Sequence, residues 1–419
     1  MKLLSSTSPK SPSKGRASNS PLEGGCWGCF DFSLLTVFYY CRRWLLNFDF
    51  YTNKDKMKNI LDKLTLSVVP LKSALKSLRI FKISYTPKRL CNVVKIISSM
   101  YLSRILKKPV VWGLPPILMI EPTNICNLKC PMCPAIVGKR VLSKGQLKLD
   151  NYKKLLDEVG DTVFQVQLWN QGEPFINKDF LEMVRYAKTY GIMTITSTNA
   201  HFVGSEAKAE EIVKSGLDQL IISMDGTNQE TYEKYRVNGD YNLVLQNLIR
   251  LARAKKKLNS KTPLIELQFI VFKHNQDEID TIIHLAKEYD IDRLSFKTPM
   301  VYSAEQADEF LVEAQKKELY RFDEQNVSRK PAVPDWCKRL WLNSTVNWDG
   351  TVVPCCFDAD SDHIFANVFE NGSSFKSTWK NKKYTAFRQA LLKNRSAIDM
   401  CRNCTEGMPE PYAKIMEIS

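Results

Sequence analysis

Hydrophobic and polar positions in the middle of the chain follow two patterns in alternation. Short apolar runs predict buried strands at residues 117–121, 164–169, 193–197, 219–223, 265–272 and 293–297. Between them, apolar residues at helical spacing predict helices at residues 151–159, 178–190, 206–215, 242–258 and 276–289. Strands that alternate with helices indicate an α/β fold with a parallel sheet and outer helices. Right-handed crossovers would curl these strands into a partial (β/α)6 TIM-like barrel.

The residues before the first predicted strand follow other patterns. Residues 2–21 are rich in Ser, Pro and Lys, which predicts disorder. Residues 30–50 are aromatic and apolar, but charges such as Arg42 and Arg43 argue against a transmembrane span. From Met57 onward apolar residues return at helical spacing, at Ile60, Leu64, Val68, Leu71, Leu75 and Leu78, with Pro70 dividing the pattern. This predicts a basic helical N-terminal arm, and Met57 is a second candidate for the start of the protein.

The positive charge is concentrated in this N-terminal part. Residues 1–110 contain 20 Lys and Arg against 5 Asp and Glu, whereas the remaining 309 residues contain 40 of each kind. A basic amphipathic stretch fits an anionic membrane surface, but a solvated helix packed on the body of the protein has the same pattern. Both interpretations stay open at this point. The neutral body argues against nucleic acid as the main substrate.

Length and pattern together suggest how the chain is divided. With 419 residues and 44% hydrophobic content, it can bury one large core and a smaller satellite. We expect a leader at residues 1–56, the basic arm at 57–112 and the partial barrel at 113–300. A linker helix at 301–334, centred on residues 304–322, would lead to a small cysteine-rich C-terminal domain at 335–412.

The clearest chemical signal is the stretch Cys126-Asn-Leu-Lys-Cys130-Pro-Met-Cys133, with the spacing C-x3-C-x2-C directly after the first predicted strand. Thiolates are soft ligands that select iron–sulfur clusters, zinc or copper. Three cysteines leave one iron of a four-iron cluster without a protein ligand, and such an iron can bind a substrate or cofactor. The chain has 12 cysteines, several at metal-ligand spacing, which indicates a reducing cytoplasm. The pair Cys26-x-x-Cys29 is by itself a weak metal signal.

The cysteine motif, its place after a strand, and Gly172-Glu173-Pro174 downstream resemble the radical S-adenosylmethionine superfamily, from about residue 116 to residue 299. Met132 departs from the aromatic residue common before the third cysteine, and its apolar side chain can fill the same wall. The resemblance implies a [4Fe-4S] cluster on Cys126, Cys130 and Cys133. It also implies reductive cleavage of S-adenosylmethionine to a 5′-deoxyadenosyl radical, which abstracts hydrogen from a substrate.

The same resemblance suggests which residues bind the cofactor. Glu173 would hold the amino group of S-adenosylmethionine, and Ser197 and Asn199 would face its ribose or carboxylate. Ser223 and Arg236 would bind the carboxylate, for which the planar guanidinium of arginine is well suited. The plain alternative for Arg236 is a surface ion pair with Glu233.

The C-terminal cysteines resemble the SPASM subgroup, which carries auxiliary iron–sulfur clusters. By this resemblance, the element C-x12-G-x4-C followed by C-x2-C would hold an auxiliary [4Fe-4S] cluster on Cys337, Cys355, Cys401 and Cys404. Cys356 is an alternative to Cys355, and four thiolates would suit a structural zinc as well. Asp358 is a candidate general base, although an acid in a solvated turn explains it equally.

The resulting hypothesis is a radical S-adenosylmethionine enzyme whose substrate is unidentified: a sugar, a lipid-linked molecule or a peptide. We expect a reductant such as ferredoxin or flavodoxin, no nucleic acid, and a location in the cytoplasm with association to the inner membrane surface through the arm. The competing hypothesis is a non-catalytic iron–sulfur or zinc protein that carries electrons. A carrier needs no carboxylate and arginine placed for a cofactor, which Glu173 and Arg236 would supply.

Overall fold

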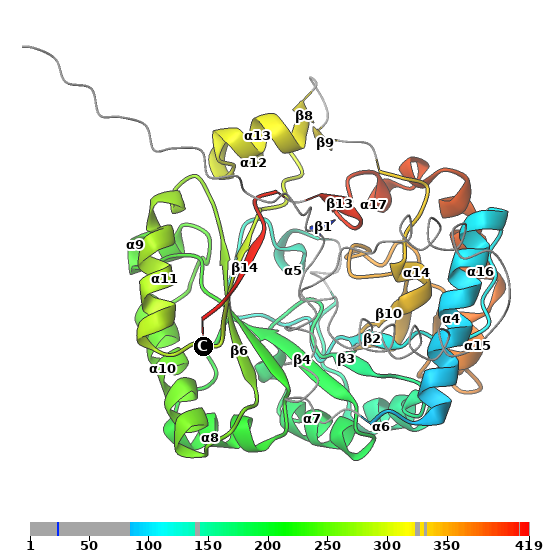
Figure 1. Ribbon diagram of the computed structural model, residues 1–419, viewed down its shortest axis with the longest axis horizontal. Coiled ribbons are helices and arrows are strands. Elements are labelled where there is room, and N and C mark those ends of the chain that lie inside the picture. Colours follow the sequence, from blue (N-terminus) through cyan, green and yellow to red (C-terminus); the bar gives the residue numbers. More distant parts are fainter. Residues whose placement is uncertain are drawn as a thin grey trace, which may run out of the picture.

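The computed structural model describes residues 23–24, 84–138, 143–322, 327–330, 333–409 and 411–418 (Figure 1). Apart from residues 23–24, the predicted leader lies outside the described residues, and so do its cysteines at 26, 29 and 41 and the first part of the arm with its pattern up to Leu78. The described arm residues form α4 (Pro87–Leu106).

Six parallel strands form the centre of a ten-stranded sheet. They are β2 (Ile117–Ile120), β3 (Gln165–Gln167), β4 (Met193–Thr198), β5 (Gln219–Ser223), β6 (Leu264–Ile270) and β7 (Arg293–Lys297). Each pairs in parallel with the next along the chain. All six strands predicted from the sequence are therefore confirmed, in a fold of mixed α/β class.

The predicted helices are also present. They are α6 (Leu149–Val159), α7 (Phe180–Thr189), α8 (Glu206–Lys214), α10 (Tyr241–Lys257), and η4 (Gln276–Glu278) followed by α11 (Ile279–Glu288). They cover the outer face of the sheet (Figure 1). Side chains alternate between the faces of a strand, and every second residue, such as Leu220 and Ile222 on β5, enters the large apolar core under the helices. Burial of this apolar face is the main favourable contribution to the fold.

The C-terminal part extends the same sheet at both edges, which the sequence did not predict. β10 (Asn343–Val346) pairs in parallel with β2, and β11 (Thr351–Val353) and β12 (Ala366–Asn367) follow antiparallel. At the other edge β14 (Lys414–Glu417) pairs antiparallel with β7. The cysteine-rich region and the barrel therefore share one sheet, and the domain boundaries stay a prediction.

The described part of the arm packs on the body. Arg89 of α4 is buried and donates hydrogen bonds to the carbonyl oxygens of Gly160 and Tyr190, both at 2.7 Å. Asn92 exchanges hydrogen bonds with the backbone of Leu114, at 2.8 and 2.9 Å. One side of α4 is therefore packed on the body of the protein, its outer face stays exposed, and attachment to a membrane stays a prediction.

The predicted linker helix is two helices, α12 (Ala304–Phe310) and α13 (Glu313–Leu319), followed by β8 (Tyr320–Phe322). The prediction of one helix was wrong because Leu311 turns to an extended conformation, with ψ 139°, where its side chain is fully buried. Gln315 then accepts a hydrogen bond from the Val312 amide at 3.3 Å, which helps to begin the second helix.

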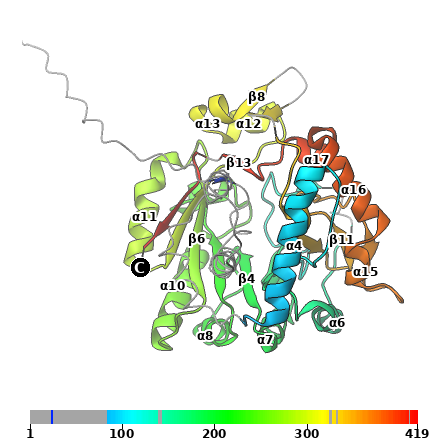
Figure 2. The same cartoon turned by 45° about the vertical axis from the view of Figure 1, so that its right-hand side comes forward.

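The remaining elements are short or belong to the C-terminal region. They are β1 (Glu23–Gly24), α5 (Pro134–Val137), η3 (Pro174–Ile176), α9 (Gln229–Glu233), β9 (Val327–Arg329), α14 (Arg339–Leu342), α15 (Phe375–Trp379), α16 (Lys382–Lys393), η5 (Arg395–Ala397), α17 (Asp399–Arg402) and β13 (Met408–Pro409). Figure 2 shows α4, α15 and α16 on one side of the sheet.

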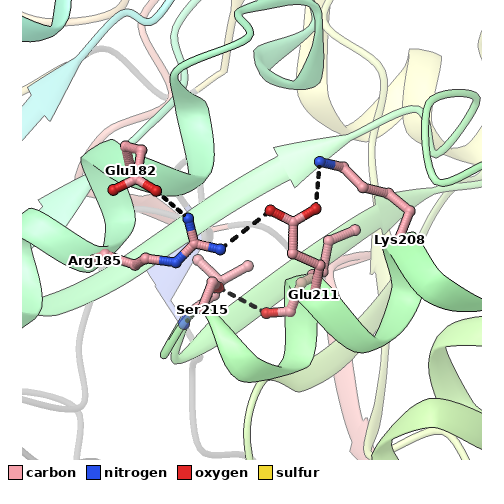
Figure 3. A network of polar contacts seen from close by, with 7 residues as sticks. Glu182, Arg185, Lys208, Glu211 and Ser215 are labelled. Carbon is pink, nitrogen blue, oxygen red and sulfur yellow. Dashed lines mark hydrogen bonds and ion pairs between the residues drawn. The ribbon is translucent and has the colours of Figure 1, made fainter.

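The outer helices are joined by polar contacts at their surfaces. Arg185 of α7 pairs with Glu182 on its own helix and with Glu211 of α8, which also binds Lys208 at 2.9 Å (Figure 3). Such exposed pairs contribute about 0–1 kcal/mol each. In the described part of the chain, no helix combines the length and the apolar character that crossing a membrane requires.

Candidate active site

The loop that carries the three N-terminal cysteines begins where β2 ends, at the carboxyl edge of the parallel sheet. Asn124 fixes it, because its amide donates to the Ser143 carbonyl at 2.6 Å and accepts from the Gly145 amide at 3.0 Å. Lys144 adds hydrogen bonds to the carbonyl oxygens of Asn124 and Ala135, at 3.0 and 2.8 Å. The loop is therefore held from outside while Cys126, Cys130 and Cys133 lie on it.

The three thiols share a largely buried environment. Burial raises the pKa of Cys126 to about 11, and it also raises the pKa values of Cys130 and Cys133. Arg236 favours the ionised form of Cys130, with Nη1 4.0 Å from its sulfur. Buried thiols of this kind become thiolates when a metal supplies positive charge. The donor set fits an iron–sulfur cluster.

Gly172 brings the next loop against the cysteine loop. Its φ of +74° is unfavourable for residues with a side chain, and a Cβ there would lie 2.5 Å from the Thr123 carbonyl oxygen. The adjacent Glu173 amide donates to the Ile125 carbonyl at 2.8 Å. The glycine of the Gly-Glu-Pro motif is thus required by this close approach of two backbones.

The Glu173 carboxylate is buried beside the cysteine loop and accepts three hydrogen bonds. The donors are the Phe175 amide at 3.2 Å, the Thr198 hydroxyl at 2.7 Å and the Asn199 amide at 2.8 Å. Burial raises its pKa to about 7, although these hydrogen bonds favour the carboxylate. A buried carboxylate of this kind is suited to receive a cation such as an ammonium group.

The residues predicted at the ends of β4 and β5 lie on the same edge. The side-chain amide of Asn199 donates to Asn127 Oδ1 at 2.8 Å, and the same nitrogen, Nδ2, is 3.8 Å from the Cys126 sulfur. Ser197 pairs in register with Ile221, on the face of the sheet opposite the large core, and is partly exposed. Ser223 lies on that face too and is buried. The structure therefore brings Asn199 to the cysteine loop and places both serines on the inner face.

Arg236 is not part of a surface pair with Glu233. It is almost buried and binds Asp225, with Nε and Nη2 each 2.6 Å from Oδ2. The other Asp225 oxygen accepts the Ile270 amide at 2.7 Å. Burial raises the pKa of Asp225, while Arg236 opposes that shift and keeps a strongly raised pKa itself. The guanidinium is thus engaged by Asp225 and Cys130, and binding of a cofactor carboxylate stays a prediction.

Sequence reasoning missed the residues that support the site. Asp225, Thr198 and Asn127 hold Arg236, Glu173 and Asn199 respectively. A signal existed for Asp225 and Thr198, since both stand at the carboxyl end of a parallel strand, where ligands bind in such sheets. For Asn127 the sequence carries no comparable signal.

The C-terminal cysteines gather in a second buried cluster. Cys337, Cys355, Cys401 and Cys404 are all buried. Burial, together with the neighbouring Cys337 thiol, raises the pKa values of Cys401 and Cys404 to about 12. The Arg395 guanidinium lies close enough to Cys337, Cys401 and Cys404 to favour their ionised forms. These four residues fit the ligand set that the sequence predicted.

Cys355 and Cys356 differ in their surroundings. The Cys355 thiol interacts with the thiols of Cys404 and Cys337, and burial raises its pKa strongly. The Cys356 sulfur is partly exposed and lies 3.8 Å from Nη1 of Arg339. Arg339 in turn forms a buried ion pair with Glu406 at 2.6 Å. This arrangement favours Cys355 as the fourth ligand.

No single-ion site stands out among the described residues, where no three His, Cys, Asp or Glu side chains are arranged around one point. The fit of the cysteines to a cluster therefore rests on donor chemistry and shared surroundings.

Asp358 stabilises its own loop. Its two oxygens accept the backbone amides of Asp362 and His363, both at 3.0 Å, and burial raises its pKa. The loop nevertheless lies beside the candidate site, because Gln171 Nε2 donates to the Ala359 carbonyl at 2.6 Å. The structure supports the turn role directly, and the catalytic role of Asp358 stays a prediction.

Polar side chains cover much of the inner face of the sheet. On β10, Val346 packs in the large core, so by alternation Asn343 and Thr345 point to the inner face. On β7 the same alternation turns Ser295 and Lys297 inward. Asn343, Thr345 and Ser295 are buried, and within the described residues their side-chain polar atoms have no hydrogen-bond partner. Such groups are costly unless a ligand or water satisfies them.

Comparison with known proteins agrees with this geometry. Residues 120–285 match the Radical SAM superfamily, and residues 337–405 match SPASM, an iron–sulfur cluster-binding domain. The second match decides between the two metals left open for the C-terminal thiols, in favour of iron–sulfur. It begins at Cys337 and includes all five C-terminal cysteines.

The chain spans about half the length of the curated relatives that it matches at about 30% identity. The chain is 31% identical over 192 residues to the Fe-coproporphyrin III synthase of Methanosarcina barkeri, which covers 45% of this chain and 44% of that protein. It is 29% identical over 192 residues to the PqqA peptide cyclase of Bradyrhizobium diazoefficiens, covering 46% and 48%. The solved structure of Streptococcus suis SuiB bound to S-adenosylmethionine has a TM-score of 0.51 at 15% identity, and the match covers 76% of each chain.

Proposed function

We propose that this chain, a radical SAM superfamily protein with a SPASM-type auxiliary domain, cleaves S-adenosylmethionine reductively and abstracts hydrogen from a polar substrate. One observation carries the proposal: the three-cysteine loop, the buried Glu173 carboxylate and the Arg236–Asp225 pair meet at one carboxyl edge of the sheet. When bound, the cluster and S-adenosylmethionine would supply a one-electron cleavage that yields a 5′-deoxyadenosyl radical.

The residues of the chain would bind and orient the cofactor. Cys126, Cys130 and Cys133 would hold three irons, and the fourth would stay open. Glu173 would accept hydrogen bonds from the cofactor ammonium, whose positive charge would compensate the charge of a buried carboxylate. Asn199 and Ser197 would face the ribose or carboxylate, with Ser223 further along the same edge. Arg236 would balance the thiolate charge of Cys130, and it would reach a carboxylate only if its pair with Asp225 rearranged.

The second cysteine group would hold an auxiliary cluster with full protein ligation by Cys337, Cys355, Cys401 and Cys404. Full ligation leaves no open iron, so electron transfer or structural support is the role we infer. The contact of Gln171 with the Ala359 carbonyl joins the auxiliary region to the cofactor loop at 2.6 Å. An external reductant such as ferredoxin or flavodoxin would deliver the electron.

The inner face of the sheet supports a substrate rich in hydrogen-bonding groups. Asn343, Thr345 and Ser295 offer buried polar atoms there that have no hydrogen-bond partner among the described residues. A sugar, a lipid-linked molecule or a peptide can supply such groups, and nucleic acid is disfavoured by the neutral charge of residues 111–419. We expect a cytoplasmic location, because cysteines that bind a cluster must stay reduced.

The test is anaerobic reconstitution of the full chain with iron and sulfide, followed by dithionite and S-adenosylmethionine. We expect 5′-deoxyadenosine to form in the wild type and in Cys91→Ser, which changes an exposed cysteine on α4. Cys130→Ser should abolish it. Formation of no more 5′-deoxyadenosine by the wild type than by Cys130→Ser would overturn the proposed function.

A further inference from the structure

We propose that the face formed by α4, the loop after it and α15–α16 docks on an anionic lipid surface. This inference does not depend on the reaction proposed above. We call this face the basic face, and define it by its exposed cations, Lys95, Arg104, Lys107, Lys108, Lys376, Lys380, Lys382, Lys383 and Lys393.

Two segments far apart in the sequence make up the basic face. The side chain of Lys380 donates to the Trp112 carbonyl at 3.3 Å, and that of Gln389 donates to the Lys107 carbonyl at 3.2 Å. The buried Trp379 indole reaches the Gly113 carbonyl at 3.0 Å. Figures 1 and 2 both show α4 and α16 side by side. The cations of the two segments therefore belong to one continuous surface.

The basic face has no acidic residue of its own. Residues 84–120 and 374–396 contain neither Asp nor Glu. Acids from elsewhere in the chain contact these segments: Glu158 of α6 binds the backbone amides of Phe375 and Lys376, and Asp161, after α6, pairs with Lys88. Asp335 accepts the Arg395 amide. These acids act at the edge of the face, so its central lysines create a positive potential toward solvent.

Large apolar side chains are exposed among these cations. Ile105 is 77% exposed, Trp112 is 52% exposed and Leu106 is 51% exposed, and they flank Lys107 and Lys108. Aliphatic and tryptophan side chains next to lysines are typical of surfaces that enter the headgroup region of a bilayer. Nucleic acid would be bound by the cations but would leave Ile105 and Leu106 without a partner. The combination therefore favours a lipid surface as the occupant.

The experiment measures co-sedimentation of the full chain, loaded with its clusters, with vesicles of phosphatidylglycerol and phosphatidylcholine. Lys107→Glu, Lys108→Glu and Lys383→Glu are combined in one variant. The matched control combines Arg253→Glu, Lys256→Glu and Lys287→Glu. These are exposed positions on α10 and α11, toward the other edge of the sheet from α4 and α16 (Figure 1). Both variants change the net charge equally, so only the location of the charge differs.

We expect the basic-face variant to partition at least about a hundredfold more weakly, because each lysine near an anionic surface contributes roughly fivefold. The control should bind as the wild type does. A second variant, Ile105→Ser with Leu106→Ser, should lose the binding that persists at high salt, since salt screens charge but not apolar insertion. The thermal unfolding midpoint of every variant should match the wild type.

Three results would overturn the proposal. The first is that the control variant weakens binding as much as the basic-face variant does. The second is that vesicles of phosphatidylcholine alone bind the wild type as well as the anionic vesicles do. The third is that the basic-face variant releases a DNA duplex while its binding to anionic vesicles is unchanged, which would make the face a nucleic-acid surface.

Discussion

Arg236 and Asp225 form a buried ion pair at the edge of the cysteine loop, with two guanidinium nitrogens each 2.6 Å from one carboxylate oxygen. Asp225 stands at the end of β5, and Arg236 follows α9, so a strand end and a helix end fix the guanidinium together. The pair orients Nη1 toward Cys130. We therefore expect the pair to couple the stability of the barrel to the retention of iron by the cysteine loop.

Asp225→Asn should lower both stability and iron retention. Breaking a buried pair leaves one charge uncompensated and costs about 3–5 kcal/mol of unfolding free energy. Urea unfolding and iron content per chain would measure the two effects. Asp218→Asn is the matched control, because Asp218 pairs with Lys188 at 2.6 Å at the amino end of β5, away from the cysteines. It should destabilise the fold and leave iron retention unchanged, and equal iron loss in both variants would contradict the coupling.

Binding of S-adenosylmethionine should strengthen as the pH rises from 6 to 8. Burial raises the pKa of Glu173 to about 7, so the group is mostly neutral at pH 6 and mostly ionised at pH 8. Only the carboxylate attracts the cofactor ammonium, and each pH unit below the pKa then costs up to about tenfold in affinity. Isothermal titration over this range would measure the effect, with the cluster content checked at each pH.

Two variants separate Glu173 from other titrating groups. Glu173→Gln should bind the cofactor weakly and lose the pH dependence, whereas Glu206→Gln, at the start of α8, should keep it. The folding stability of the ligand-free protein depends on pH in the opposite direction. A carboxyl group whose pKa is higher in the folded state binds more protons there, so its contribution to stability falls as the pH rises from about 4.5 to 7. A pH profile that persists in Glu173→Gln would exclude this carboxylate as its origin.

The two adjacent C-terminal cysteines should behave differently. Cys355→Ser should lose the auxiliary cluster, because Cys355 lies with Cys337 and Cys404, and iron per chain should fall toward the content of one cluster. Cys356→Ser should keep both clusters, since Cys356 faces Arg339. Iron analysis and electron paramagnetic resonance of the reduced proteins would show the difference. The reverse pattern would assign Cys356 as the ligand.

Gly172→Ala should disrupt the contact between the two loops of the site. Its positive φ costs a residue with a side chain about 1 kcal/mol, and the added Cβ would also lie 2.5 Å from the Thr123 carbonyl oxygen. Gly204→Ala is the matched control, because Gly204 has φ +66° with nothing within 4 Å of the added atom. We expect Gly204→Ala to lower the unfolding free energy slightly, and Gly172→Ala by at least about 2 kcal/mol more. Equal losses in urea unfolding would refute the steric argument.

Local pattern in the sequence determined the six central strands, their covering helices, the cysteine loop and the position of Glu173. Apolar periodicity specifies which face of an element is buried, and parallel strands between helices place all their carboxyl ends on one edge. The spacing of Cys126, Cys130 and Cys133 is likewise local, so the order of residues alone indicates the chemistry of this loop.

Only the tertiary structure decided which distant segments meet. β10 pairs with β2, from which it is separated by more than two hundred residues in the sequence. Arg236 binds Asp225 rather than Glu233. Cys356 lies against Arg339, whereas Cys355 lies with the other buried cysteines. The same holds for the basic face, which α4 and α16 form together. Each of these outcomes depends on packing energies between surfaces remote in sequence, for which the adjacent residues carry no periodic signal.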